Sequence, residues 1–110
     1  MKKPARSVVE KATDQFLLTL RQRNASAHTI KAYAGDLENF SQYVGTRGWD
    51  KIDHLAIRGF LSHLYEKGLG KTSVARSLAA VRSLYRWLAQ EALRERGAAP
   101  ADELQRLALA

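Results

Sequence analysis

Carboxylates that could act as a general acid and base occur in two pairs, and neither pair has a catalytic arrangement. Asp36 and Glu38 are two residues apart within a predicted helix, and side chains at that spacing do not face each other. Asp50 and Asp53 stand where a loop leads into a helix, and Asp is a common helix cap. Hydrolysis by acid–base catalysis needs positioned groups, so these pairs predict structural roles.

Metal-binding and nucleophilic residues are equally sparse. The chain contains no Cys, which excludes thiolate catalysis and Cys-based zinc sites. Its three His residues, His28, His54 and His63, do not stand with acids at metal-ligand spacing. Residues 68–72 (Gly-Leu-Gly-Lys-Thr) are similar to the end of a phosphate-binding loop but lack the spacing between its glycines. The sequence therefore predicts no catalytic residue, no metal site and no cofactor in this chain.

Basic residues carry a stronger signal. The chain has 110 residues, with 18 Lys and Arg against 11 Asp and Glu, a net charge of +7 and a pI near 10.1. No acid occurs between Asp14 and Asp36, or between Glu66 and Glu91. The cations in these two acid-free windows are Arg21, Arg23 and Lys31, and then Lys67, Lys71, Arg76, Arg82 and Arg86. Both windows cover the start of a predicted helix, where backbone N–H groups and the helix dipole favour anions. The charge pattern therefore predicts contact with phosphate.

The elements that must position these residues are predicted to be helices alone. Ala (17) and Leu (15) far outnumber Val (5) and Ile (3), a composition that favours helix over strand. Apolar residues recur every three or four positions in four segments, over about residues 7–23, 26–44, 53–67 and 72–96. Ser26 and Asp53 are predicted N-caps, Thr72 or Ser73 is predicted to cap the fourth helix, and Gly45 is predicted to end the second. We expect an all-α fold, a compact four-helix bundle.

The fourth helix has a distinctive predicted outer face. At about 100° per residue, a core stripe of Val74, Leu78, Val81, Tyr85 and Leu88 lies opposite Arg76. The small residues predicted to surround Arg76 are Thr72, Ser73, Ala79, Ala80 and Ser83. Small side chains let a helix enter a major groove while one long donor reaches a guanine edge or a phosphate. Arg82 and Arg86 are predicted on one flank, and Trp87 near the outer face. A solvated bundle face is the alternative interpretation.

The start of the second helix gives a weaker signal. His28, Thr29 and Lys31 in its first turns suit phosphate binding. The same stretch, which begins at Ser26, is also what the start of any helix requires. Both interpretations remain open from these residues alone.

Two blocks of sequence resemble a known family. Ser26, Thr29, Tyr33, Asp36-Leu37 and Phe40 match the pattern S-x-x-T-x-x-x-Y-x-x-D-L-x-x-F, which opens the core-binding domain of tyrosine recombinases. The run from Lys71 to Leu88 is similar to the family's T-x-x-R-x-L-S-A-L-R-S-F-F-x-F-L helix, especially in Xer-type members. The resemblance extends from about Val9 to Pro100, nearly the whole chain.

The resemblance implies a SAM-like four-helix domain that forms one half of a clamp around double-stranded DNA. It implies contacts from the second helix through His28, Thr29 and Lys31, and from the fourth through Thr72, Ser73, Arg76 and Ser83. Lys71, Arg82 and Arg86 complete the set of DNA-binding residues that we predict. Other recombinase subunits are implied partners, and the isolated domain is expected to be monomeric. Whether the parent protein resolves chromosomes, moves a mobile element or integrates a phage stays open.

The resemblance also has limits. Family members usually show Asn-Pro after the last helix, whereas this chain has Ala99-Pro100. The family's chemistry uses Arg, Lys, His and a nucleophilic Tyr in a separate C-terminal domain, and none of the tyrosines here stands in such a motif. We therefore expect residues 1–96 to bind DNA without cleaving it. Residues 97–110 are predicted to be a tail or the start of a linker to that catalytic domain.

Two other kinds of protein fit parts of the pattern. A helical protein-interaction module would use the outer helix face and Trp87 to bind a partner. A helix-turn-helix repressor would need a short recognition helix, and the predicted fourth helix is long. Because no apolar run is long enough for a membrane span and residues 1–4 lead into polar sequence, we expect a cytoplasmic protein with no membrane partner.

Overall fold

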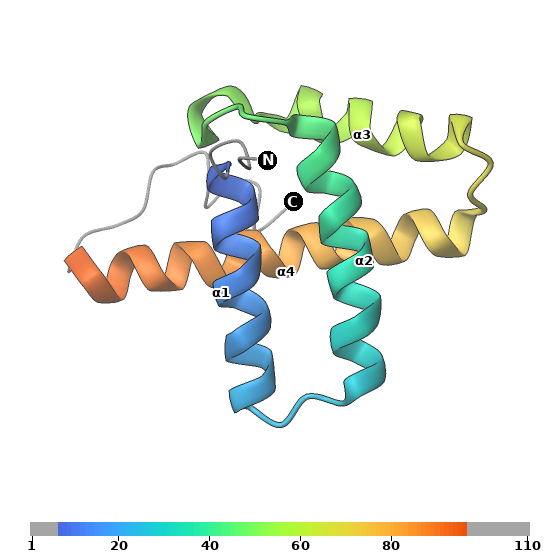
Figure 1. Cartoon of the computed structure of the whole chain (residues 1–110). Coiled ribbons are helices and arrows are strands. Elements are labelled where there is room, and N and C mark those ends of the chain that lie inside the picture. Colours follow the sequence, from blue (N-terminus) through green and yellow to red (C-terminus); the bar gives the residue numbers. More distant parts are fainter. Residues whose placement is uncertain (1–6, 97–110) are drawn as a thin grey trace, which may run out of the picture.

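The computed structural model describes residues 7–96, and it describes side chains for residues 7–92. Its elements are α1 (Val8–Gln22), α2 (Ala27–Val44), the 3-10 turn η1 (Trp49–Lys51), α3 (His54–Glu66) and α4 (Lys71–Arg96). In Figure 1, α1 and α2 lie side by side as an antiparallel pair and cross α4, while α3 runs along α4. Residues 7–96 contain no strand. The predicted all-α bundle of four helices is confirmed.

Local sequence determines where most of the helices begin and end. Ser7 starts α1 with a capping box, in which its side chain and that of Glu10 each accept a backbone N–H. Ser26 and Asp53 cap α2 and α3 as predicted, each with a side-chain oxygen that accepts a backbone N–H three residues later. The helix α2 ends at Gly45, whose φ of 63° lies in the left-handed region that glycine tolerates.

The start of α4 differs from the prediction. Thr72 or Ser73 was the expected cap, but the helix already begins at Lys71. The N–H of Val74 donates to the carbonyl oxygen of Gly70 at 3.0 Å, which puts Gly70 in the N-cap position. Glycine is accepted there although it offers no side-chain oxygen. Thr72 and Ser73 therefore belong to the first turn of α4.

Aromatic residues fill the point where α2, α3 and α4 meet. The ring of Phe40 in α2 lies 5.2 Å from that of Phe60 in α3 and 6.4 Å from that of Tyr85 in α4, both edge-on. The ring of Trp49 lies 5.4 Å from Tyr85. Phe40, Phe60 and Tyr85 are at most 1% exposed. Edge-to-face pairs of this kind add about 0.5–1.5 kcal/mol each beyond their burial, so this cluster fixes three helices together.

Trp87 corrects the predicted outer face of α4. The helical projection put Trp87 near the solvent side, but its side chain is 8% exposed and its ring lies 5.8 Å from that of Phe16 in α1. Ala80, also predicted on the outer face, is fully buried. Because α4 packs against α1, α2 and α3, its buried arc is wider than the stripe expected for a helix with one neighbour. Burial of Ala80 could not be predicted from its type, because small residues occur on both buried and exposed helix faces.

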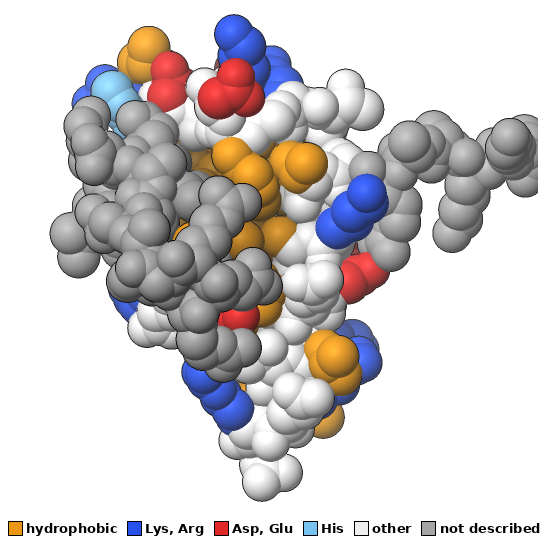
Figure 2. Space-filling model, turned by 90° about the vertical axis from the view of Figure 1, so that its left-hand side faces the viewer, with side chains coloured by type: hydrophobic (Ala, Val, Ile, Leu, Met, Phe, Trp, Pro, Cys, Tyr) orange, Lys and Arg blue, Asp and Glu red, His pale blue; other side chains and the backbone are white. Residues whose placement is uncertain are grey.

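The surface of the bundle mixes apolar and basic side chains. Figure 2 shows the face that lies on the left of Figure 1, where hydrophobic side chains gather near the middle and Lys and Arg lie toward the edges. None of the helices that the structure describes has the length and apolar content of a membrane span.

A close approach of α2 and α3 depends on Gly59. A Cβ atom at this position would lie 2.5 Å from Tyr43 Oη. The Tyr43 ring packs against the rings of Phe60 and His63, at 5.6 and 5.2 Å. We expect Gly59→Ala to lower the free energy of unfolding by about 1–2 kcal/mol, because overpacking outweighs the better helix propensity of Ala. Urea denaturation followed by circular dichroism measures this change.

Gly35 in α2 is the matched control. A Cβ there would meet nothing within 4 Å, so Gly35→Ala is expected to stabilise the protein by about 0.5–1 kcal/mol through helix propensity alone. If Gly59→Ala and Gly35→Ala changed the free energy of unfolding in the same direction, the expected clash between a Cβ at position 59 and Tyr43 would be contradicted.

Candidate nucleic-acid interface

A hollow of about 520 Å³ lies between α2 and the start of α4. It brings together His28 and Lys31 from α2 and Arg76 from α4, three of the residues that the sequence assigned to DNA binding. The other lining residues are Ala32, Gly35, Asp36, Glu38 and Asn39. We call this depression the α2–α4 hollow. Its cations come from both acid-free windows of the sequence.

The first turn of α2 positions its polar residues through the N-cap. Ser26 Oγ accepts the Thr29 N–H at 3.1 Å and donates to Thr29 Oγ1 at 2.8 Å. Thr29 is half-buried. Because its Oγ1 accepts the hydrogen bond from Ser26, its own hydroxyl hydrogen can be donated to another acceptor. His28 and Lys31 are exposed beside it, and this first turn holds no acid. The exposed side chains of His28 and Lys31 thus lie at a helix end that favours anions.

Arg76 lies at the contact between α4 and α2. Its Nε donates to Asp36 Oδ2 at 2.9 Å and its Nη2 donates to Asp36 Oδ1 at 3.0 Å. Ser77 Oγ donates to the same Oδ1 at 3.1 Å. Asp36 is 3% exposed and Ser77 is fully buried, whereas the Arg76 side chain is 52% exposed. We call these three residues the Asp36 cluster.

The Asp36 cluster has an electrostatic consequence. Hydrogen bonds from Arg76 to Asp36, and the negative charge of Asp36, raise the pKa of Arg76 above its ordinary value. The pair therefore favours the protonated guanidinium, the form that Arg has in proteins in any case. The ion pair could not be predicted from residue spacing, because Asp36 and Arg76 are 40 residues apart in the sequence.

The exposed side of α4 is rotated from the predicted one. Its exposed residues are Lys71, Thr72, Ala75, Arg76, Ala79, Arg86 and Gln90, and Ser73, Arg82 and Ser83 are half-buried. At about 100° per residue the exposed arc is centred roughly 70° away from Arg76. Arg76 thus marks the edge of this arc on the α2 side, and Lys71 and Arg86 lie about 22 Å apart along it at 1.5 Å per residue.

Arg82 lies apart from the α2–α4 hollow. It borders an apolar groove of about 240 Å³ between α3 and α4, whose lining includes Ile57, Leu61 and Leu78. The structure therefore does not bring Arg82 together with His28 and Lys31. The charge of Arg82 faces the flank of α4 nearest α3.

Most of the basic residues of α2 and α4 form no ion pair within the described part of the protein. Among the side chains that the structure describes, no carboxylate lies within ion-pair distance of Lys31, Lys71, Arg82 or Arg86. Exposed or half-buried Lys and Arg without an acidic partner attract polyanions. The surface can therefore hold phosphate groups by charge and hydrogen bonding.

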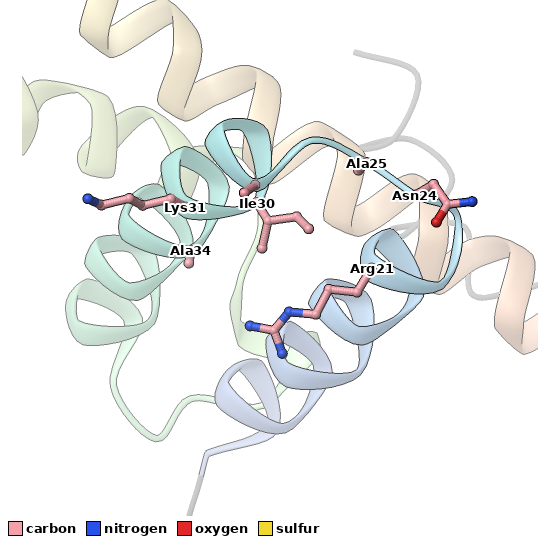
Figure 3. Close-up of a pocket in the computed structure, with 7 residues that line it drawn as sticks. Arg21, Asn24, Ala25, Ile30, Lys31 and Ala34 are labelled. Atoms are coloured by element: carbon pink, nitrogen blue, oxygen red, sulfur yellow. The ribbon is translucent and has the colours of Figure 1, made fainter.

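A second hollow extends the basic surface toward α1. It has a volume of about 620 Å³ and is lined by Arg21, Asn24, Ala25, Ala27, Ile30, Lys31 and Ala34. Figure 3 shows the Arg21 side chain reaching toward the space between α1 and α2, while Lys31 extends away on the other side of α2. Lys31 borders both hollows. Arg21 stands in an acid-free window of the sequence but is not one of the predicted DNA-binding residues.

Comparison with known proteins identifies the family. The family described as phage integrase, N-terminal SAM-like domain, matches residues 13–92, a region that contains all ten predicted DNA-binding residues. Proteins called tyrosine recombinase XerC are 35% identical over 89 residues in Pseudomonas fluorescens, 38% over 82 in Oceanobacillus iheyensis and 34% over 80 in Syntrophus aciditrophicus.

These alignments cover 77%, 71% and 64% of this chain but only 30%, 27% and 26% of the relatives, so the chain spans less than a third of their length. No solved structure matches the chain. The family match and the recombinase relatives agree with the resemblance drawn from the sequence blocks. The chain belongs to the phage integrase N-terminal SAM-like domain family.

Proposed function

We propose that this chain binds double-stranded DNA as the N-terminal domain of a tyrosine recombinase and grips it through exposed residues of α2 and α4. Residues 1–96 are the binding domain in this proposal. Residues 97–110, a tail or the start of a linker in this proposal, lie outside the described residues. In this proposal strand cleavage and rejoining belong to a separate catalytic domain, since none of the tyrosines in the sequence stands in the family's nucleophile motif.

One observation carries the proposal. The α2–α4 hollow brings together Lys31 and Arg76 from two sequence-distant windows. Lys31 beside it, and Lys71 and Arg86 on α4, have no carboxylate partner among the described side chains. Surfaces that neutralise DNA phosphates are built from such unpaired Lys and Arg. Exposed Ala75 and Ala79 between them on α4 leave room for a close approach of the duplex.

The alternative of a protein-interaction module loses its predicted anchor. Trp87 was the aromatic residue expected to contact a partner, but it packs in the core against Phe16. Protein-interaction surfaces are enriched in exposed aromatic anchors, and both aromatic residues among the described side chains of α4, Tyr85 and Trp87, are buried. Apart from Gln90, the exposed residues of α4 are basic or small instead, which supports DNA over a protein as the occupant of the α4 face.

Duplex DNA titration tests the proposal. We expect the 110-residue chain to bind a fluorescein-labelled duplex of mixed sequence at low salt, as measured by fluorescence anisotropy. Lys31→Ala is expected to weaken this binding about fivefold, because one phosphate contact is lost.

Lys51→Ala is the matched control, since it removes the same charge from η1. In Figure 1, η1 lies at the top of the bundle and the start of α2 at the bottom. We expect this control to change the affinity less than about twofold. Equal weakening by both variants would contradict an interface at the start of α2, and a chain that binds no duplex would contradict the proposed function itself.

A further inference from the structure

The Asp36 cluster places a buried carboxylate directly behind a basic DNA-facing residue. We infer that Asp36 is a positioning residue, which holds Arg76 so that the outer edge of the guanidinium binds a pair of acceptor atoms on double-stranded DNA. Those acceptors are two phosphate oxygens or the edge of a guanine. This inference rests on the proposed function, because it concerns the same surface.

The hydrogen-bond geometry supports this role. A guanidinium has five N–H groups in a rigid planar fork, and Asp36 accepts one from Nε and one from Nη2 of Arg76. The second N–H of Nη2 and both N–H groups of Nη1 are left. The Arg76 side chain is 52% exposed and borders the α2–α4 hollow. The outer fork of Arg76 is thus free to bind two adjacent acceptors, as Arg does with phosphate or guanine.

Burial of Asp36 makes the arrangement rigid. Asp36 is 3% exposed and also accepts a hydrogen bond from fully buried Ser77, so its carboxylate cannot follow a moving guanidinium. A long exposed Arg normally loses side-chain freedom when it binds a ligand, and a side chain that is already ordered loses less. Held by Asp36, Arg76 meets DNA in the orientation it keeps in the free protein.

Removing the charge of Asp36 has opposite expected effects on DNA affinity, depending on whether Asp36 positions Arg76 or acts only through its charge. Asp36→Asn removes a negative charge, so attraction to DNA alone predicts tighter binding. If Asp36 positions Arg76, the same variant weakens duplex binding by about three- to tenfold, because the bidentate contact to the guanidinium is lost. Glu38→Gln is the matched control, since it removes a carboxylate from an exposed residue of the same hollow. We expect Glu38→Gln to tighten binding about twofold.

Anisotropy titrations of these variants on the mixed-sequence duplex decide the question. The inference is overturned if Asp36→Asn tightens binding as Glu38→Gln does. Failure of the wild-type chain to bind would instead overturn the proposed function, so the two failures are distinguishable. Urea denaturation confirms that each variant is folded under the conditions of the titration.

Arg76→Lys keeps the test decisive if Asp36→Asn does not fold. Lysine retains the charge but cannot contact Asp36 with two N–H groups and hold two DNA acceptors with a planar outer fork. We expect Arg76→Lys to lose most of the affinity that Arg76→Ala loses. Wild-type affinity in Arg76→Lys would overturn the inference.

Modified duplexes distinguish the two acceptor sources. If Arg76 contacts guanine, replacing guanine with 7-deazaguanine removes one of its two acceptors and reduces the difference between wild type and Arg76→Ala. If it contacts phosphate, methylphosphonate linkages abolish that difference. A wild-type and an Arg76→Ala chain that bind unmodified duplex equally would overturn both forms.

Discussion

Replacing Trp87 with alanine is expected to lower the free energy of unfolding by about 3–5 kcal/mol, the usual range for a large buried aromatic residue. Trp87 is 8% exposed, and its ring packs 5.8 Å from that of Phe16, which in turn stacks 6.3 Å from that of Tyr33. The side chain therefore joins α4 to α1 and, through Phe16, to α2. Urea denaturation followed by circular dichroism measures the loss.

Trp87→Phe is the control for this experiment. Trp87 Nε1 is buried and has no hydrogen-bond partner among the residues that the structure describes. Phenylalanine keeps a ring in the core and removes this unsatisfied donor, so we expect a loss below about 1.5 kcal/mol. A Trp87→Ala variant as stable as wild type would mean that the side chain faces solvent, as the helical projection predicted.

Salt is expected to weaken DNA binding steeply. If Lys31, Lys71, Arg76 and Arg86 each neutralise one phosphate, raising monovalent salt from about 50 to 200 mM lowers the affinity on the order of a hundredfold. The physical reason is that each contact releases condensed counterions from the duplex, and added salt opposes that release. Anisotropy titrations over a series of salt concentrations give the slope of log affinity against log salt.

The Lys31→Ala variant tests whether the slope of log affinity against log salt reflects the number of phosphate contacts. Loss of one phosphate contact reduces the slope by about one, whereas Lys51→Ala should leave it unchanged. Affinity that does not depend on salt would contradict a phosphate-based interface. It would indicate that DNA is bound mainly through apolar contacts, and the apolar groove between α3 and α4 would then be the candidate site.

Local rules explain how much of the fold could be predicted. The caps at Ser26 and Asp53 and the end of α2 at Gly45 depend only on neighbouring residues, and the structure confirms all three. The start of α4 was predicted too late, because Gly70 takes the N-cap position without any side-chain signal. A glycine cap looks the same as a glycine in a turn when only the sequence is read.

The candidate site was predictable in part for the same reason. Acid-free windows are visible along the chain, and His28, Lys31 and Arg76 from them do line one hollow. Arg82 lies beside a different groove, because a helix with neighbours on several sides divides its polar residues between them. Residue spacing alone does not specify how many neighbours a helix has.

Residue types at short spacing are enough to predict the helices, most of their ends, the excess of positive charge and the family blocks. The rotation of α4 about its axis depends instead on its tertiary contacts. Trp87 and Ala80 are buried and Arg76 is held at the α2 edge, because α4 crosses α1 and α2 and packs along α3 (Figure 1). The pairing of Asp36 with Arg76 likewise exists only once two helices 40 residues apart in sequence come into contact.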